Sequence, residues 1–232
     1  MTNRRQISLL GAAALALFAV TGCSSDDDNP VSPGTPAAQA RVMAVHASPD
    51  APAVDLLVDG TIAGTALAFP NSTPYLSVTS GTRNVKVNVT GTATTVINAD
   101  LALSANTNYS VFATDSVASI GALVLTDDLT APAAGKAHVR FVHLSPNAPA
   151  VDVAVQGGAV LFANRSFKEF APFTPVDAGT YNLEVRLAGS STVVLPLNGI
   201  VLQAGKIYTV FAKGFVGGAA AQALGAQIIV NN

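Results

Sequence analysis

Short runs of alternating apolar and polar residues recur along most of the chain after about residue 40. Residues 83–90 and 181–187 alternate most clearly. A period of two is typical of β-strands with one buried face, and clusters of Gly, Pro, Asn and Asp interrupt the runs at roughly ten-residue intervals. The pattern predicts an all-β chain rather than a helical one.

Eight strands are expected in each of two successive segments. In the first segment they cover residues 41–47, 53–59, 62–67, 74–78, 83–90, 94–102, 108–114 and 119–126. In the second they cover 138–144, 150–156, 159–164, 172–176, 180–187, 191–201, 207–213 and 223–230. The Ala-rich residues 217–224 also suit a helical turn, but their glycines favour a loop. So many short strands in such a length predict an antiparallel, immunoglobulin-like β-sandwich in each segment.

An internal repeat divides the chain into these two segments. Val42–Gly60 aligns with Val139–Gly157, and Tyr109–Ala113 aligns with Tyr208–Ala212. Repeats of this length are duplicated whole domains, not solenoid units. We therefore expect one sandwich at 40–128, a short linker at 129–136 that limits relative motion, and a second sandwich at 137–232.

The N-terminus has the features of an export signal. Arg4 and Arg5 precede a short apolar run that ends in Val20-Thr-Gly-Cys23. The run is too short to span a bilayer, and its end resembles the bacterial lipobox, which implies cleavage after residue 22 and lipidation of Cys23. The alternative is a soluble secreted protein with an incidental Cys. Residues 23–39 carry Pro and little apolar bulk, which predicts a flexible tether.

The amino-acid composition limits the classes of partner, site and cellular location that this chain can have. Charged residues make up only 11% of the 232 residues, against roughly 25% in an average soluble protein. The 12 basic and 14 acidic residues give no reason to expect a nucleic-acid partner. A single Cys excludes a disulfide framework and multi-cysteine metal sites. Ser24, after the lipobox Cys, resembles the outer-membrane default of Gram-negative lipoproteins, and Asp26–Asp28 weakly resembles a surface-export signal. The expected location is thus the bacterial envelope, with the outer membrane favoured and the side left open.

The most distinctive motif is His-x-Ser-Pro-x-Ala-Pro-x-Val-Asp, which occurs once in each segment. Its chemistry-bearing residues are His46, Ser48, Pro49 and Asp55 in the first copy and His143, Ser145, Pro146 and Asp152 in the second. On this motif the chain resembles a bacterial envelope family classed only as a domain of unknown function, whose members often carry tandem copies behind a lipoprotein signal. The resemblance implies the architecture and no activity.

The motif residues suit a structural role. Each His ends a strand on its more apolar face, where a Ser or the Asp across the Pro-rich turn is placed to satisfy the ring. Metal binding or general-base chemistry through His and Asp is the alternative, but one His and one carboxylate fall short of a catalytic zinc site. Calcium at Asp50, Asp55 and Asp59 is a further alternative, weakened by Asn and Gln at two of the equivalent positions.

Aromatic residues suggest two further features. Tyr109 and Tyr208 each open a strand, six residues after a Leu, and this placement predicts tyrosine corners. Phe112 and Phe211 fall on the opposite strand face and are expected to point outward from each module. The segment 161–173 is Phe-rich, which favours either internal packing or an exposed contact surface for a protein or cell-wall polymer. That candidate surface comprises Phe162, Phe167, Phe170 and Phe173.

These observations predict a non-enzymatic envelope lipoprotein with a structural, adhesive or protein-interaction role. No nucleophile elbow, phosphate loop or His-Glu-x-x-His helix occurs, and neither a cofactor nor a bound metal is expected. One alternative is a module that binds carbohydrate or cell-wall polymer, which needs exposed aromatics along one groove. The other is a hydrolase or metal-dependent enzyme, which needs a pocket that gathers His46 or His143 with two further polar groups. The expected partners are the membrane, through the lipid anchor, and an unidentified protein or polysaccharide.

Overall fold

The computed structural model describes residues 37–232, which are almost entirely β-structure, as the alternation predicts. The first eight strands are β1 (Gln39–His46), β2 (Val54–Val58), β3 (Thr61–Leu67), β4 (Leu76–Thr79), β5 (Gly81–Val89), β6 (Thr95–Leu103), β7 (Asn108–Thr114) and β8 (Gly121–Asp127). The second eight are β9 (Lys136–His143), β10 (Val151–Val155), β11 (Val160–Arg165), β12 (Thr174–Asp177), β13 (Gly179–Leu187), β14 (Val193–Leu202), β15 (Ile207–Lys213) and β16 (Gly225–Val230). Short 3₁₀ turns, η1 (Val117–Ser119) and η2 (Ala220–Gln222), precede β8 and β16.

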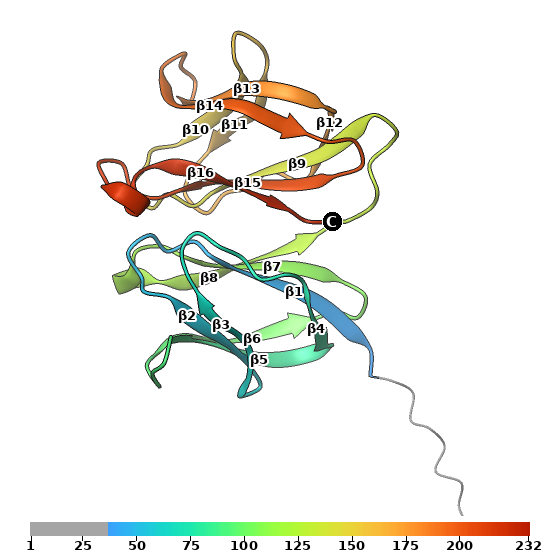
Figure 1. Cartoon of the computed structure of the whole chain (residues 1–232), viewed down its shortest axis with the longest axis vertical. Helices are drawn as coiled ribbons and strands as arrows, with labels where there is room; N and C mark the ends of the chain where they lie inside the picture. The colour runs from blue at the N-terminus through green and yellow to red at the C-terminus, as the bar shows by residue number, and fades with distance from the viewer. Residues whose placement is uncertain (1–36) are drawn as a thin grey trace, which may run out of the picture. The chain divides into compact units, whose positions relative to one another are not determined.

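The strands form four sheets, two for each repeat (Figure 1). In the first repeat the orders are β4-β1-β7-β8 and β3-β2-β5-β6, and in the second they are β12-β9-β15-β16 and β11-β10-β13-β14. The tandem sandwiches are as predicted, but neither is wholly antiparallel, because β1 runs parallel to β7 and β9 runs parallel to β15. Each parallel pair joins strands far apart in sequence, so the intervening strands supply the crossover that parallel neighbours need.

Each sandwich encloses its own core. Val54, Leu56 and Val87 of the first repeat are buried between its two sheets. Their counterparts Val151, Val153 and Val185 are buried in the second. These are the alternating apolar positions of the sequence, since successive side chains of a strand point to opposite faces.

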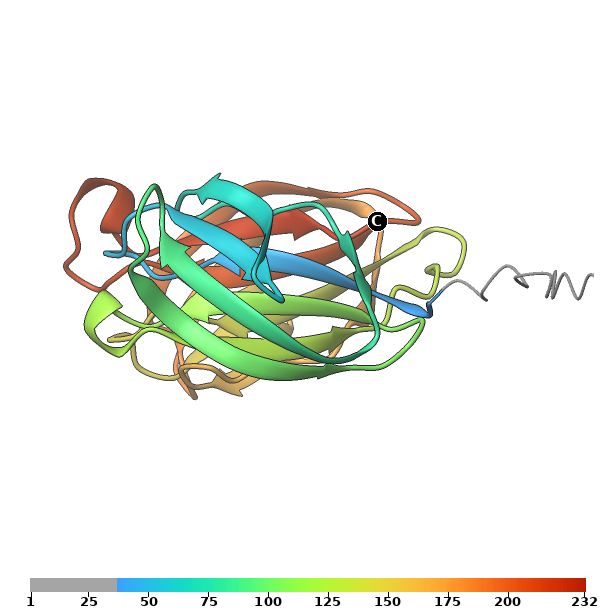
Figure 2. The ribbon, with the colours of Figure 1, turned by 90° about the horizontal axis from the view of Figure 1, so that it is seen from below.

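A third core lies between the two sandwiches. The sheet containing β1, β7 and β8 faces the sheet containing β9, β15 and β16 (Figure 1). Seen from below, the first sandwich therefore lies over the second (Figure 2). Its buried residues are Met43, Val45, Ala47, Phe112, Leu125, Val142, Leu144, Phe211 and Ile229. Strands β7 and β15 are therefore buried on both faces, which explains why residues 109–113 and 207–212 read as nearly unbroken apolar runs.

The two tyrosines tie loops to the sandwiches, as predicted. The Tyr109 hydroxyl accepts a hydrogen bond from the backbone N–H of Ser104 at 3.0 Å, and Tyr208 accepts one from Gln203 at 3.0 Å. Both side chains are buried. The matching geometry shows that the loop before β7 and the loop before β15 are held in the same way.

The predicted signal peptide, the lipidation of Cys23 and nearly all of the tether lie outside the described residues. The helical segments described within residues 37–232 all fall short of the length and hydropathy of a membrane-spanning helix.

Candidate functional site

The two motif histidines are placed alike, at the ends of β1 and β9. His46 Nε2 lies 2.9 Å from the Pro52 carbonyl oxygen, and His143 Nε2 lies 3.1 Å from that of Pro149. A carbonyl oxygen only accepts, so each Nε2 carries a proton and donates it. Both rings are fully buried, and this burial lowers the pKa of each histidine. The histidines are therefore neutral, and the hydrogen bond that each one donates holds the Pro-rich turn against its strand.

The motif aspartates hold different turns and do not contact the histidines. Asp55 accepts hydrogen bonds from the backbone N–H groups of Ala66 (2.8 Å) and Gly91 (3.2 Å). These bonds, the one from Ala66 above all, lower the pKa of Asp55. Asp152 accepts hydrogen bonds from the backbone N–H groups of Asn164 (2.6 Å) and Gly189 (2.9 Å). The sequence offered either the Ser or the Asp of the motif as the partner of the histidine ring, and neither is correct, because a proline carbonyl oxygen takes that place and the carboxylates bind backbone donors of other turns.

The serines of the motif are less alike. Ser145 Oγ donates to the Gly214 carbonyl oxygen at 2.6 Å, which ties the motif to the loop after β15. Ser48 is buried, and its Oγ has no hydrogen-bond partner among the described residues. Pro49 is buried and Pro146 half-buried, which fits their expected role of stiffening the turn.

The residue after each Ser-Pro pair completes the clamp on that loop. Asn147 donates through Nδ2 to the Val216 carbonyl oxygen (3.0 Å) and accepts through Oδ1 from the Val216 N–H (2.8 Å). Asp50, its counterpart, accepts from the Val117 N–H at 2.8 Å. An Asp at this position binds only the N–H of the Val in the loop, whereas an Asn binds both its N–H and its carbonyl oxygen. These contacts explain the difference between the copies without a calcium ion.

The acidic residues of the calcium alternative serve separate contacts. Asp50 holds Val117, Asp55 holds the turns described above, and Asp59 pairs with Arg83 at 3.1 Å. No group of three or more His, Cys, Asp or Glu side chains within residues 37–232 is arranged to hold a metal ion.

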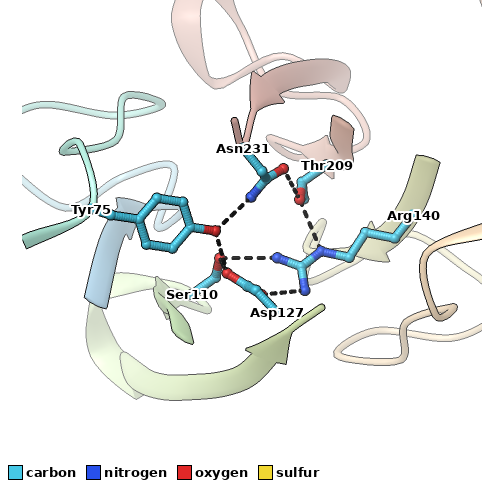
Figure 3. A network of polar contacts seen from close by, with 6 residues as sticks. All are labelled: Tyr75, Ser110, Asp127, Arg140, Thr209 and Asn231. Atoms are coloured by element: carbon cyan, nitrogen blue, oxygen red, sulfur yellow. Dashed lines mark hydrogen bonds and ion pairs between the residues drawn. The ribbon is translucent and has the colours of Figure 1, made fainter. Parts of the chain in front are cut away.

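A buried polar network crosses the interface between the sandwiches (Figure 3), and the sequence interpretation missed it. It comprises Tyr75, Ser110 and Asp127 of the first sandwich and Arg140, Thr209 and Asn231 of the second. Four of these residues occupy two pairs of equivalent positions in the repeats. Ser110 is equivalent to Thr209, and Asp127 is equivalent to Asn231, because the corresponding strands of the two repeats pair in the same register. The signal in the sequence was Arg140, a charged residue on a strand whose other face is apolar.

Arg140 and Asp127 form the charged centre of this network. Arg140 Nη1 lies 2.6 Å from Asp127 Oδ1, and their side chains are 2% and 0% exposed. The contact is an ion pair without hydrogen-bond geometry at Oδ1. Arg140 Nε donates to Thr209 at 2.8 Å, and Nη2 donates to Ser110 at 2.9 Å. Removing one partner of this pair would leave the other charge buried without a counter-charge, which costs more than the formation of the pair contributes.

The other carboxylate oxygen of Asp127 accepts hydrogen bonds from two hydroxyl groups. Tyr75 donates to Asp127 Oδ2 at 2.5 Å and Ser110 donates at 2.6 Å. Tyr75 in turn accepts from Asn231 Nδ2 at 3.0 Å. Burial, with the neighbouring negative charge of Asp127, raises the pKa of Tyr75 far above its ordinary value. The phenol therefore stays protonated and serves as a fixed donor.

The Phe-rich segment does not form one exposed surface. Phe162 is buried and stacks on Phe141 with ring centroids 6.3 Å apart, so it belongs to the core of the second sandwich. Phe173 is half-buried, with the Arg140 guanidinium 4.5 Å from its ring centroid. Phe167 is half-buried beside Lys168, and Phe170 alone is largely exposed, at 45%. Packing thus accounts for most of the predicted contact surface.

Comparison with known proteins assigns the repeats to one family model. Residues 40–154 and 146–232 match the model described as "Domain of unknown function (DUF4397)". Comparison with curated proteins finds no match. The two matched ranges together cover both sandwiches and overlap at residues 146–154, because the first range extends past the first sandwich into β9 and β10.

Proposed function

We propose that this chain, which belongs to the DUF4397 family defined by a domain of unknown function, is a non-enzymatic lipoprotein of the bacterial envelope. Lipidated Cys23 anchors it to the membrane, which in this proposal is the outer membrane. The tandem sandwiches then form a structural or adhesive unit beyond the tether.

The observation that best supports a structural role is the use made of the repeated motif. His46 and His143 donate to proline carbonyl oxygens, while Asp55 and Asp152 accept from backbone N–H groups. Catalytic groups need polar atoms that are free to meet a substrate. These side chains instead use their polar atoms to hold turns, and they do so in both copies.

The interface between the sandwiches also supports this role. Two domains joined only by a flexible linker would move independently of each other. The two sandwiches of this chain are instead joined by a buried apolar core and a buried ion pair. A contact surface that spans both sandwiches gains from such joining, because less conformational freedom is lost when it binds a partner.

The anchor is tested with a Cys23→Ala variant in a Gram-negative host. The proposal expects the unaltered chain to incorporate labelled palmitate and to sediment with outer membranes, and the variant to lose the label and leave the membrane fraction. A Ser24→Asp variant controls for sorting, since it should stay lipidated but change membrane. Wild-type chain without palmitate, with its leader uncleaved, would refute the anchor.

The structural role of the motif is tested by thermal unfolding in metal-free buffer. His46→Ala or His143→Ala is expected to lower the melting temperature, because each variant removes a buried hydrogen bond and leaves a cavity. Adding a chelator to the unaltered protein should change nothing. A chelator effect as large as that of the variants would show instead that the motif holds a metal.

The polymer-binding alternative has less support, since it requires aromatic side chains exposed along a groove. Phe170 is the one member of the predicted set that is largely exposed. Sedimentation with purified peptidoglycan tests the remaining possibility. Phe170→Ser should not alter sedimentation under our proposal, and Val201→Ser, which removes another exposed apolar side chain, is the matched control.

A further inference from the structure

The two repeats differ at one free edge of their sheets. Strand β4 is an edge strand of the first repeat, and β12 is the equivalent edge strand of the second. Each has four residues and pairs on one side only, β4 with β1 and β12 with β9. The registers of these pairings make Ser77 equivalent to Pro175 and Thr79 equivalent to Asp177.

In the first repeat, the backbone groups at these two positions point away from the sheet. Residues of an antiparallel pair alternate between those that bond to the neighbouring strand and those whose N–H and C=O groups face the other way. The Ser80 N–H donates to the Ala38 carbonyl oxygen at 2.8 Å. By this alternation Val78 also bonds to β1, whereas Ser77 and Thr79 direct their N–H and C=O groups to the free edge. Both residues are exposed, so this edge is accessible to a partner.

In the second repeat, the equivalent edge is blocked. The Ala178 N–H donates to the Gly135 carbonyl oxygen at 2.9 Å, and the same alternation places Pro175 and Asp177 on the free edge. Proline has no N–H to donate, and Asp177 adds a carboxylate to the edge. Proline and charged residues on edge strands are devices by which proteins prevent the addition of a further strand. The first repeat lacks both devices at its equivalent edge.

A groove runs beside the open edge. It has a volume of about 360 Å³ and is lined by residues of β4 and of β3, the edge strand of the other sheet of this sandwich. Its apolar lining includes Val58, Val78 and Ile62, and the Ile62 side chain is 61% exposed. Asp59 and Arg83, the charged residues that line it, pair with each other at 3.1 Å. The groove therefore offers apolar contact and no uncompensated charge.

We propose that β4 and this groove bind an extended, uncharged peptide segment of a partner protein by strand addition. The alternating N–H and C=O groups of a sheet edge are matched by another extended backbone, and this complementarity fixes the class of partner. The segment pairs with Ser77 and Thr79, and its side chains on the inner face enter the groove beside Ile62. At about 3.4 Å per residue, β4 has room for roughly five residues of the segment.

The binding site goes beyond the proposed envelope role and does not depend on the lipid anchor. A second copy of the chain fits the groove less well than a free segment does. If two copies paired through β4, each would bring a Val78 that is already buried in its own sandwich and cannot enter the groove of the other. A free segment has no such prior packing, so its inner side chains are available.

The test uses the peptide acetyl-Thr-Val-Thr-Val-Thr-amide as the probe. It is titrated into the full chain carrying Cys23→Ala, which prevents acylation, and backbone amide signals are followed by NMR. The amide signals of Ser77 and Thr79 are expected to shift, and their hydrogen exchange is expected to slow, because both N–H groups gain an acceptor. The amide of Asp177 should not respond. Absent shifts at Ser77 and Thr79, or equal shifts at Asp177, would overturn the proposal.

Two modified peptides test strand addition itself. Alternate N–H groups of a strand point to opposite edges, so only one set of the peptide's N–H groups can face β4. N-methylation of the Val residues and N-methylation of the Thr residues should therefore differ, one abolishing binding and the other preserving it. Equal binding of the two methylated peptides would show that the contact is not a strand pairing.

Matched variants place the site on β4. Ser77→Pro introduces the residue of the blocked edge and is expected to weaken peptide binding at least about 10-fold, while the melting temperature holds because the lost N–H faced solvent. Ser77→Ala keeps that N–H and should bind as the unaltered chain does. Ile62→Ser removes apolar contact and should weaken binding about 3- to 10-fold.

Thr79→Asp, which introduces the charge of the second repeat, replaces Ser77→Pro if that variant does not fold. Unchanged binding in a folded Ser77→Pro or Thr79→Asp variant would overturn the proposal. Sedimentation without peptide tests the other occupant. A monomer is expected, and a dimer that Ser77→Pro dissociates would show instead that a second copy occupies this edge.

Discussion

Phe112 and Phe211 meet edge-to-face at the centre of the interface between the sandwiches, with ring centroids 6.0 Å apart and planes inclined by 72°. They stand at equivalent positions of β7 and β15, and neither is exposed to solvent. Equivalent residues that contact each other place the two repeats in a nearly symmetric, face-to-face arrangement. The outward aromatic expected of each module thus points out of its own sandwich and packs against the facing sheet of the other.

This contact predicts that the two sandwiches unfold together. Phe112→Ala and Phe211→Ala should each lower the free energy of unfolding by about 3–5 kcal/mol, as large core truncations do. The double variant should cost less than the sum of the two by about 0.5–1.5 kcal/mol, the coupling of an aromatic pair. Urea unfolding followed by circular dichroism gives all three values. Additive effects, or one sandwich melting unaffected, would contradict a shared interface.

The buried ion pair predicts an asymmetric response to substitution. Arg140→Met places in the second repeat the residue that the first carries at Met43, and it leaves Asp127 charged and unpaired. We expect a loss of about 3–5 kcal/mol in the free energy of unfolding, measured in urea.

A second substitution checks the cause of that loss. Asp127→Asn introduces the residue found at the equivalent Asn231, and combined with Arg140→Met it removes both buried charges. The double variant is expected to recover most of the lost stability, since replacing a whole buried pair is often nearly neutral. If it is no more stable than Arg140→Met alone, packing rather than charge explains the effect.

The loop clamp predicts a local change on exchanging Asn and Asp between the copies. Asn147→Asp removes the donor to the Val216 carbonyl oxygen, which should cost about 1 kcal/mol and speed hydrogen exchange of amides 215–224. Hydrogen exchange followed by mass spectrometry measures this. Asp50→Asn in the first repeat is the reciprocal control and should not accelerate exchange near Val117. Equal exchange in the wild type and Asn147→Asp would show that the clamp contributes nothing.

The buried histidines predict a loss of stability at acid pH. Burial lowers the pKa of His46 and His143 below the ordinary value of 6.5, so between the folded and unfolded pKa values the unfolded chain binds more protons. The free energy of unfolding should therefore fall as the pH drops through about 6.5, by up to about 1.4 kcal/mol per pH unit for each histidine.

Urea titrations between pH 5 and 8 measure that slope. Replacing His46 and His143 with Gln should flatten it, although the variant is less stable overall. His138→Gln, which removes the remaining, half-buried histidine, controls for loss of a histidine as such. A slope that survives in the His46→Gln/His143→Gln variant would assign the acid effect to other groups.

The alternation of side chains along the chain determined much of the fold. It placed every strand between residues 39 and 230, with β7 and β15 at the predicted bounds, because a strand with one buried face must alternate. The repeat likewise gave two sandwiches, since equal sequences bury equal faces. Edges such as those of β1 and β9 shifted by a few residues, because hydrogen bonds to neighbouring strands, not the local pattern, set where a strand ends.

What the sequence by itself determined about this protein is the identity of its units: two copies of one β-sandwich, with a His and Pro motif that holds a turn. Only the tertiary structure decided what the outward faces do. In the sequence, Phe112 and Arg140 are only an aromatic and a charged residue on the outward faces of two strands. The opposite sandwich buries both side chains, and that surface is formed by residues distant in the chain. Likewise the groove between β3 and β4 arises from the edges of two sheets that no local pattern brings together. Local periodicity fixes which side of a strand is apolar, whereas packing decides which of two apolar sides meets which neighbour.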